Sequence, residues 1–181
     1  NIEQDDSVKA FLVTEDLKDE EYINSHYIIM ATKKGQVKKT SLEQYSRPRL
    51  NGINAITIKE GDELLEAKLT NGKSQVMLAL KSGKSIRFEE AKTRPMGRTA
   101  SGVRGITLQH DKDEVIGMVA VDDMNSDILV VSEKGYGKRS SVEDYRITNR
   151  GGKGVKTLNI SEKTGNLVAI KNVDNSNDLM I

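Results

Sequence analysis

The chain repeats one pattern three times, and this repetition is what most constrains its fold. Each copy has an apolar run, a polar pair, a glycine and a short second strand that carries positive charge. The apolar run is typical of a strand buried on both faces, and the glycine suits a tight hairpin position with positive φ. Gly35, Gly83 and Gly135 lie 48 and 52 residues apart. A period of this length, set by strands and turns, indicates an all-β array of propeller-like, four-stranded blades.

The repeats also divide the chain. We expect repeat one at 26–73, repeat two at 74–125 and repeat three at 126–176. Residues 1–25 are predicted to be the end of a preceding blade followed by an acidic surface linker, because a polar turn and an apolar strand near the start match the later copies. Residues 177–181 restart the apolar strand. The sequence therefore predicts an interior piece of a longer array.

Charge is sorted within each repeat, although the formal net charge is only +1. Segments 33–49, 81–105 and 133–156 together hold 20 Lys and Arg residues against 6 Asp and Glu, while the rest of the chain holds 8 and 21. A repeating fold brings equivalent segments to equivalent positions. We therefore expect one basic band that binds a polyanion.

The candidate phosphate contacts lie on the second strands and on the glycine-rich loops that follow them. Arginine supplies a planar fork that fits phosphate oxygens. In these loops Gly52, Gly102 and Gly154 each precede a β-branched residue, so we interpret them first as turn requirements. The candidates are Lys38, Lys39, Arg47, Arg49, Arg87, Arg94, Arg98, Arg104, Lys138, Arg139, Arg146, Arg150, Lys153 and Lys156.

Between hairpin and loop, segments 41–45, 89–93 and 141–145 predict short helical turns, in which a Ser or Thr next to acidic residues favours capping. We interpret Tyr45 and Tyr145 as side chains packed against the blade rather than stacked on bases.

The sequence gives no sign of catalysis. The carboxylate pairs Asp62/Glu63 and Asp113/Glu114 recur at strand-opening turns, which favours a structural role. The two histidines are far apart, so a hydrolytic triad or a histidine metal site is not expected. No cysteine is present, which excludes disulfides and thiolate metal sites. No run reaches the roughly 18 apolar residues of a membrane span, so we expect no membrane partner.

Four stretches of the sequence resemble a known protein family. Residues 30–40, 61–64, 94–106 and 135–139 are similar to the C-terminal domain of the DNA gyrase A subunit, in the right order through nearly the whole chain. The resemblance implies a six-bladed β-pinwheel, a propeller variant whose blades exchange a strand with a neighbour, of which this chain is about three blades. It also implies sequence-tolerant wrapping of double-stranded DNA on a basic rim, in support of negative supercoiling.

The resemblance further implies a non-catalytic piece that needs no cofactor of its own. In that family ATP and Mg²⁺ are used by other parts of the enzyme. The gyrase B subunit and the second A subunit are partners of other domains, in the bacterial cytoplasm and associated with the chromosome.

The family's signature heptapeptide belongs to its first blade. The similar residues 149–154 lie in repeat three of this chain, so we assign them no special role.

Two other interpretations stay open. The A-type subunit of topoisomerase IV shares the blade design. A protein-binding β-propeller is the alternative from another class, although the absence of tryptophan and the threefold sorting of charge argue against it.

Overall fold

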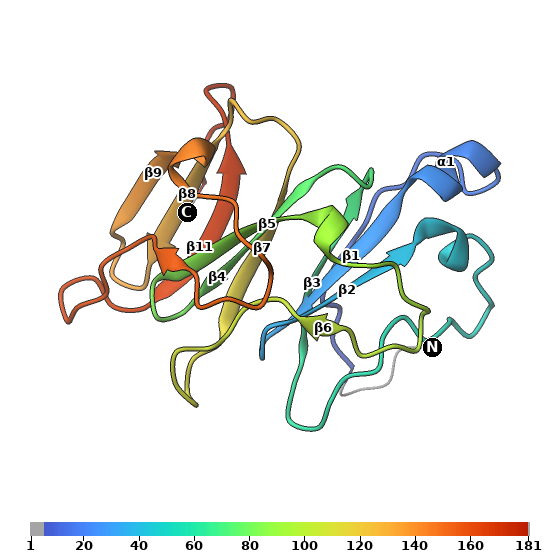
Figure 1. The fold of residues 1–181 in the computed structure, drawn as a ribbon, viewed down its shortest axis with the longest axis horizontal. Coiled ribbons are helices and arrows are strands. Elements are labelled where there is room, and N and C mark those ends of the chain that lie inside the picture. The colour runs from blue at the N-terminus through green and yellow to red at the C-terminus, as the bar shows by residue number, and fades with distance from the viewer. Residues whose placement is uncertain (1–5, 181) are drawn as a thin grey trace.

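Three antiparallel sheets form the architecture of the computed structural model, which describes residues 6–180 (Figure 1). The first sheet has the strand order β3-β1-β2-β6, the second β10-β5-β4-β7 and the third β11-β8-β9. This all-β arrangement is the one that the repeats predict. The elements are α1 (Glu20–Ser25), β1 (Tyr27–Thr32), β2 (Gln36–Ser41), η1 (Leu42–Tyr45), β3 (Leu64–Thr70), β4 (Gln75–Leu80), β5 (Lys84–Glu89), η2 (Glu90–Lys92), β6 (Val103–Arg104), β7 (Val115–Val121), β8 (Asp127–Ser132), β9 (Gly137–Ser141), η3 (Val142–Asp144), β10 (Val155–Lys156) and β11 (Leu167–Val173).

Each repeat opens with the predicted hairpin. The strand pairs β1–β2, β4–β5 and β8–β9 are antiparallel, and Gly35, Gly83 and Gly135 sit in their turns with φ of +82°, +81° and +79°. A residue with a Cβ rarely adopts this conformation, which explains the recurrent glycine. The predicted helical turns follow as the 3₁₀ helices η1, η2 and η3.

The sheets exchange strands. Strand β6 belongs to repeat two but pairs with β2 of repeat one, and β10 of repeat three pairs with β5 of repeat two. The third sheet has three strands in the described residues instead of the predicted four, because no described loop pairs with β9 as β6 pairs with β2 and β10 with β5. Ile53 and Asn54, which correspond to the residues of β6, form no strand and pair with no described strand.

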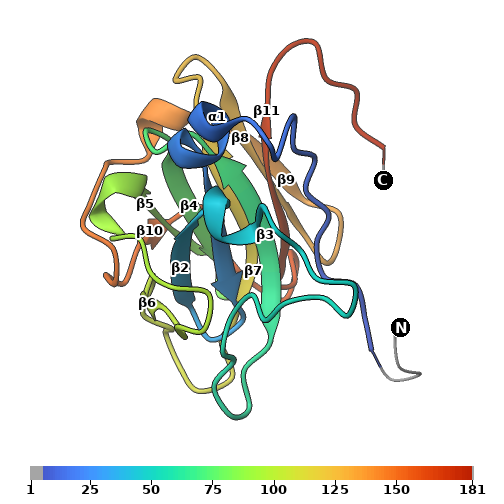
Figure 2. The same cartoon turned by 90° about the vertical axis from the view of Figure 1, so that its right-hand side faces the viewer.

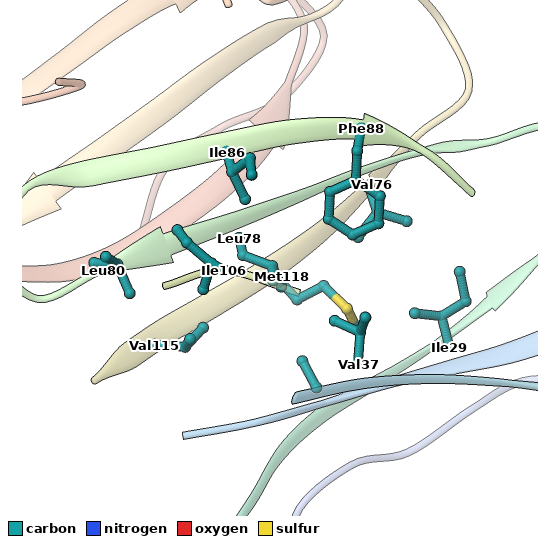
Figure 3. Close-up of a cluster of buried hydrophobic side chains, with 11 residues drawn as sticks. Ile29, Val37, Val76, Leu78, Leu80, Ile86, Phe88, Ile106, Val115 and Met118 are labelled. Carbon is teal, nitrogen blue, oxygen red and sulfur yellow. The ribbon is translucent and has the colours of Figure 1, made fainter. Parts of the chain in front are cut away.

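The apolar runs are the central strands of their sheets. Strands β1, β4 and β8 each pair on both sides, and their side chains fill the space between neighbouring sheets. In the first such cluster Ile29 and Val37 of sheet one meet Leu78 and Phe88 of sheet two (Figure 3). Strands β3, β7 and β11 form one edge of their sheets and lie next to one another from sheet to sheet, so they, and not the apolar runs, are the innermost strands. Figure 2 shows these strands toward one side of the molecule, and β6 and β10 on the opposite, outer side.

Three local predictions were wrong or lie outside the described residues. The acidic linker contains the helix α1, whose first turn is capped by the Asp19 carboxylate, an acceptor for the amides of Glu21 and Tyr22. The predicted strand near the start is absent between residues 6 and 13, where Phe11 and Val13 are exposed and no partner strand is at hand. Residues 178–180 form no strand either, and residues 1–5 and 181 are not described.

Candidate nucleic-acid interface

The three basic loops lie in one continuous row along the outer side of the sheets. The loop of repeat two, 94–105, runs beside β2, where the Met96 amide donates to the Lys39 carbonyl at 2.7 Å. The loop of repeat three, 146–156, runs beside β5 in the same way, with the Thr148 amide 2.9 Å from the Arg87 carbonyl. Equivalent loops therefore occupy equivalent places on successive sheets. We call this row of loops, residues 46–57, 94–105 and 146–156, the outer rim.

Hydrogen bonds between backbone groups join the loops to one another. The amide of Thr57 donates to the carbonyl of Ala100 at 3.3 Å, which connects the first loop to the second. The amide of Gly151 donates to the carbonyl of Gly105 at 2.6 Å, which connects the second to the third. The outer rim is thus a single surface rather than three separate loops.

Most of the predicted basic side chains lie exposed on or beside this surface. Within residues 6–180, seven of them are exposed and their side chains make no hydrogen bond or ion pair with the protein. Such groups are available for phosphate oxygens. These seven are Arg47, Arg49, Arg94, Arg104, Lys138, Arg146 and Lys153.

Four others are partly engaged. The Arg150 guanidinium donates to the carbonyls of Lys92 (3.0 Å) and Arg104 (3.1 Å), so it holds the rim together and still reaches solvent. Arg98 makes only a long contact of 3.5 Å with the Asn54 carbonyl, and Lys156 one of 3.4 Å with Asn159. Arg139 is bound to Asp127 and Asn175.

Lys38 was wrongly predicted as a phosphate contact. Its side chain is fully buried, and its ammonium donates to the carbonyls of Ala55, at 2.5 Å, and Arg98. Burial, reinforced by the charge of Arg98, lowers the pKa of Lys38 to about 8. The ammonium therefore ties the rim of repeat two to that of repeat one from beneath.

The predictions for Lys39 and Arg87 are wrong for a similar reason. Lys39 is 4% exposed and its ammonium lies 2.9 Å from a carboxylate oxygen of Glu90. Arg87 is 6% exposed and donates to the carbonyls of Val142 (2.7 Å) and Tyr145 (2.8 Å). Each side chain ends against the 3₁₀ helix of the following repeat, η2 for Lys39 and η3 for Arg87. Neither reaches the surface.

Two hollows on the outer rim lie next to free basic groups. One, of about 260 Å³, is lined by Arg49, Gly52 and Arg98, where the first and second loops meet. The other, of about 240 Å³, is lined by Arg146, Gly152 and Lys153 and lies over β5. A guanidinium group beside a shallow recess can donate two parallel N–H bonds to a phosphate, which suits a ligand bound through its backbone and not through its bases.

Other residues sort as follows. Lys92, which is absent from the predicted set, is exposed at the end of η2 beside the Arg150 side chain. The sequence did contain a signal for it, because a basic residue ends a predicted helical turn next to a basic loop.

Tyr145 is buried and Tyr45 is half-buried. The Tyr145 hydroxyl bonds to Thr157 and the Tyr45 hydroxyl to the Ala55 carbonyl, so both pack against the blade as predicted. The Asp62 and Asp113 carboxylates, from the turns that open β3 and β7, accept the amides of Lys34 and Ser82 in the neighbouring hairpin turns. Among the described residues, no group of three or more His, Asp or Glu side chains is placed to hold a metal ion.

The geometry agrees with a comparison against known protein families. The family described as "DNA gyrase C-terminal domain, beta-propeller" matches residues 26–71, 76–122 and 126–174, one match for each sheet of the structure. The chain belongs to this family. Its three sheets are therefore gyrase-type propeller blades, and the outer rim is a surface of such a domain.

Individual relatives support the assignment. The DNA gyrase A subunits of Staphylococcus epidermidis and Staphylococcus aureus are each 44% identical over 99% of this chain. The chain spans only 20% of the length of those relatives.

Two solved structures show the same fold at 23% identity. The C-terminal domain of DNA topoisomerase IV has a TM-score of 0.78 over 84% of this chain and 47% of its own, and the DNA gyrase A C-terminal domain one of 0.72 over 83% and 50%. Within residues 6–180, no helix of this gyrase-type domain has the length and apolar character needed to cross a bilayer.

Proposed function

We propose that this chain binds double-stranded DNA along its outer rim, without regard to sequence, and wraps the duplex around the edge of the blade array. The observation that carries the proposal is the continuity of the rim. Three basic loops from three repeats are joined by backbone hydrogen bonds, and seven exposed basic side chains on or beside them have no partner among the described residues. A duplex that follows the row meets free cations on each blade in turn.

The chemistry of the rim favours contacts with phosphate over contacts with bases. No helix of the described residues is placed to enter a groove, since α1 has six residues and lies in the acidic segment before repeat one. The arginines stand on loops and their partners are backbone carbonyls or solvent. Binding then depends on the number of phosphates neutralised and on the energy of bending the duplex.

We further propose that the chain acts as the non-catalytic, DNA-wrapping part of a gyrase A subunit and supports negative supercoiling by the whole enzyme. ATP and Mg²⁺ are then used by other parts of the enzyme, and this piece needs neither. The gyrase B subunit and a second A subunit are partners of other domains. The setting is the bacterial cytoplasm, in association with the chromosome.

Gyrase is preferred over topoisomerase IV because the relatives at 44% identity over nearly the whole chain are gyrase A subunits, whereas the resemblance in fold extends to both enzymes at 23%. The protein-binding propeller is the remaining alternative. It predicts a partner protein and no affinity for DNA that depends on salt.

The test is the salt dependence of binding to a duplex of random sequence. If about six phosphates are contacted, log affinity falls linearly with log salt with a slope of about −5. Two unrelated duplex sequences of equal length should give the same affinity within about threefold, because no base is read. An affinity that is absent, or that does not change with salt, would remove the proposed function.

A further inference from the structure

One position in the second strand of every repeat is basic: Lys39 in β2, Arg87 in β5 and Arg139 in β9. In the first two repeats the side chain is buried and leaves its own sheet for the 3₁₀ helix of the next repeat. Strand exchange alone does not require a charge here. A buried cation that recurs at the junction between blades needs a further explanation, since burying a charge is costly unless it is paired.

The two junctions satisfy their cation in different ways. Lys39 meets a carboxylate: its ammonium is 2.9 Å from Glu90, and the two side chains are 5% and 0% exposed. The same carboxylate accepts from the Thr70 hydroxyl at 2.7 Å and from the Ser74 amide at 3.2 Å. The Glu90 carboxylate is thus held by Thr70 of strand β3 in repeat one and by Ser74 of its own repeat, as well as by Lys39.

Arg87 meets no carboxylate at the corresponding place. Val142 occupies the position in η3 that Glu90 occupies in η2, and the guanidinium donates instead to the backbone carbonyls of Val142 and Tyr145. Its Nε also donates to the Gln75 side chain at 2.5 Å. Repeat one likewise has an apolar residue, Leu42, at this position. The carboxylate occurs only in the repeat that faces a lysine.

The difference follows from the shapes of the two cations. The guanidinium is a planar fork whose N–H groups can reach two carbonyls at once, and it is weakly hydrated, so it can be buried without a counter-charge. The ammonium is a compact and strongly hydrated point charge. If valine or leucine replaced Glu90, the Lys39 ammonium would lose its partner, and removing one partner of a buried ion pair is strongly destabilising.

We propose that the Lys39–Glu90 pair is a registry contact: it determines that repeat two, and neither of the repeats with an apolar residue at this position, packs against the outer strand of repeat one. The rule has a direction. A lysine at the strand position of Lys39 requires an acidic residue at the first position of the next 3₁₀ helix, whereas an arginine at that position does not. By the same rule Arg139, exposed on the free edge of β9, marks a junction that accepts a repeat with an apolar residue there.

The test is reciprocal exchange of the two junction types in the 181-residue chain. Glu90→Val should raise the unfolding equilibrium constant on the order of 100-fold, because it leaves the Lys39 ammonium buried and unpaired. Adding Lys39→Arg should recover at least tenfold, since the fork can reach the carbonyls of the η2 turn. In the other junction Arg87→Lys should be destabilising, and Val142→Glu should rescue it.

Two further measurements make the test specific. Hydrogen exchange at the amides of β6 reports whether the exchanged strand stays docked, and its protection should be lost with Glu90→Val and regained in the double variant. The half-exposed pair Lys81–Glu114, 3.5 Å apart, is the control, and Lys81→Arg should not rescue Glu114→Val.

Each outcome of this test either supports or overturns the registry contact. A Glu90→Val chain that fails to fold, next to a Lys39→Arg/Glu90→Val chain that folds, counts as rescue and supports the registry contact. Additive effects at both junctions, or a Lys39→Arg/Glu90→Val chain that also fails to fold, would overturn it.

Discussion

The Nζ of Lys38 lies 2.5 Å from the carbonyl oxygen of Ala55, inside a junction that holds two basic loops together. Because burial lowers the pKa of Lys38 from 10.5 in the unfolded chain to about 8, the folded state binds fewer protons between these two values. Folding stability should therefore rise with pH from about 8 toward 10.5, by on the order of 3 kcal/mol in total.

Urea unfolding at a series of pH values from 7 to 9.5 checks this prediction. Tyr45 does not interfere in that range, because burial raises its pKa above 10.0. The rise should be missing from Lys38→Met and present in Lys138→Met, which changes the equivalent but exposed lysine of repeat three. Parallel curves for wild type and Lys38→Met would show that Lys38 is not the group responsible.

The junction glycines should differ in their tolerance of a side chain. Gly102 has φ of +90°, and a Cβ there would lie 2.5 Å from the Val37 carbonyl; Gly154 has φ of +72° and would place its Cβ 2.5 Å from the Ser85 carbonyl. Gly52 has φ of +77°, yet nothing lies within 4 Å. Alanine should cost about 1 kcal/mol at Gly52, from backbone strain alone, and about 3 kcal/mol at the other two sites.

Denaturant midpoints of the three alanine variants make this comparison directly. Equal losses at all three positions would mean that the close approach of the exchanged strand contributes nothing.

Arg87 and Arg146 belong to the same predicted set but should behave in opposite ways. Arg87→Ala removes the donor to two buried carbonyls and should lower the free energy of unfolding by about 3 kcal/mol. Arg146→Ala changes an exposed side chain and should alter stability by less than about 0.5 kcal/mol. DNA affinity, measured at a temperature where both variants are folded, should fall only for Arg146→Ala. If Arg87→Ala lost DNA affinity and Arg146→Ala did not, Arg87 would be a DNA contact, contrary to its buried position in the structure.

The sequence was sufficient for the features that recur in every repeat. The apolar runs, the hairpin glycines and the 3₁₀ helices follow from local sequence patterns that occur in all three repeats. Because the three copies agree, little doubt remains about which residues form strands, turns and helices. The basic loops followed for the same reason. Helix α1 could not be recognised this way, because its segment occurs once and its acidic composition is equally compatible with a loop.

The burial of Lys38, Lys39 and Arg87 was not predicted because it depends on a contact between repeats. A strand such as Gln36–Ser41, with two adjacent lysines, has the composition of an exposed edge. Only the knowledge that β6 from the next repeat covers it shows otherwise. A signal did exist: Glu90 interrupts a position that is Leu42 and Val142 in the other repeats, and an acidic residue at a recurrent apolar position indicates a buried cation nearby.

The outer rim is the centre of this account, and charge reversal at matched sites tests it most directly. One triple variant changes Arg49, Arg104 and Arg146 to Glu, each on a different loop of the rim. The control changes Lys68, Lys163 and Lys171 to Glu; Lys68 and Lys171 lie on the inner strands β3 and β11, and Lys163 lies in the turn before β11. Both triples alter the net charge by the same amount.

The measurement is the Kd for one long duplex at about 0.1 M salt, where the Debye length of about 10 Å screens distant charges. The rim triple should bind on the order of 100-fold more weakly than the wild type and show a shallower salt slope. The control triple should stay within about threefold of the wild type, with both proteins folded. Equal losses of affinity in the two triples would contradict the account, because only total charge, and not the outer rim, would then bind DNA.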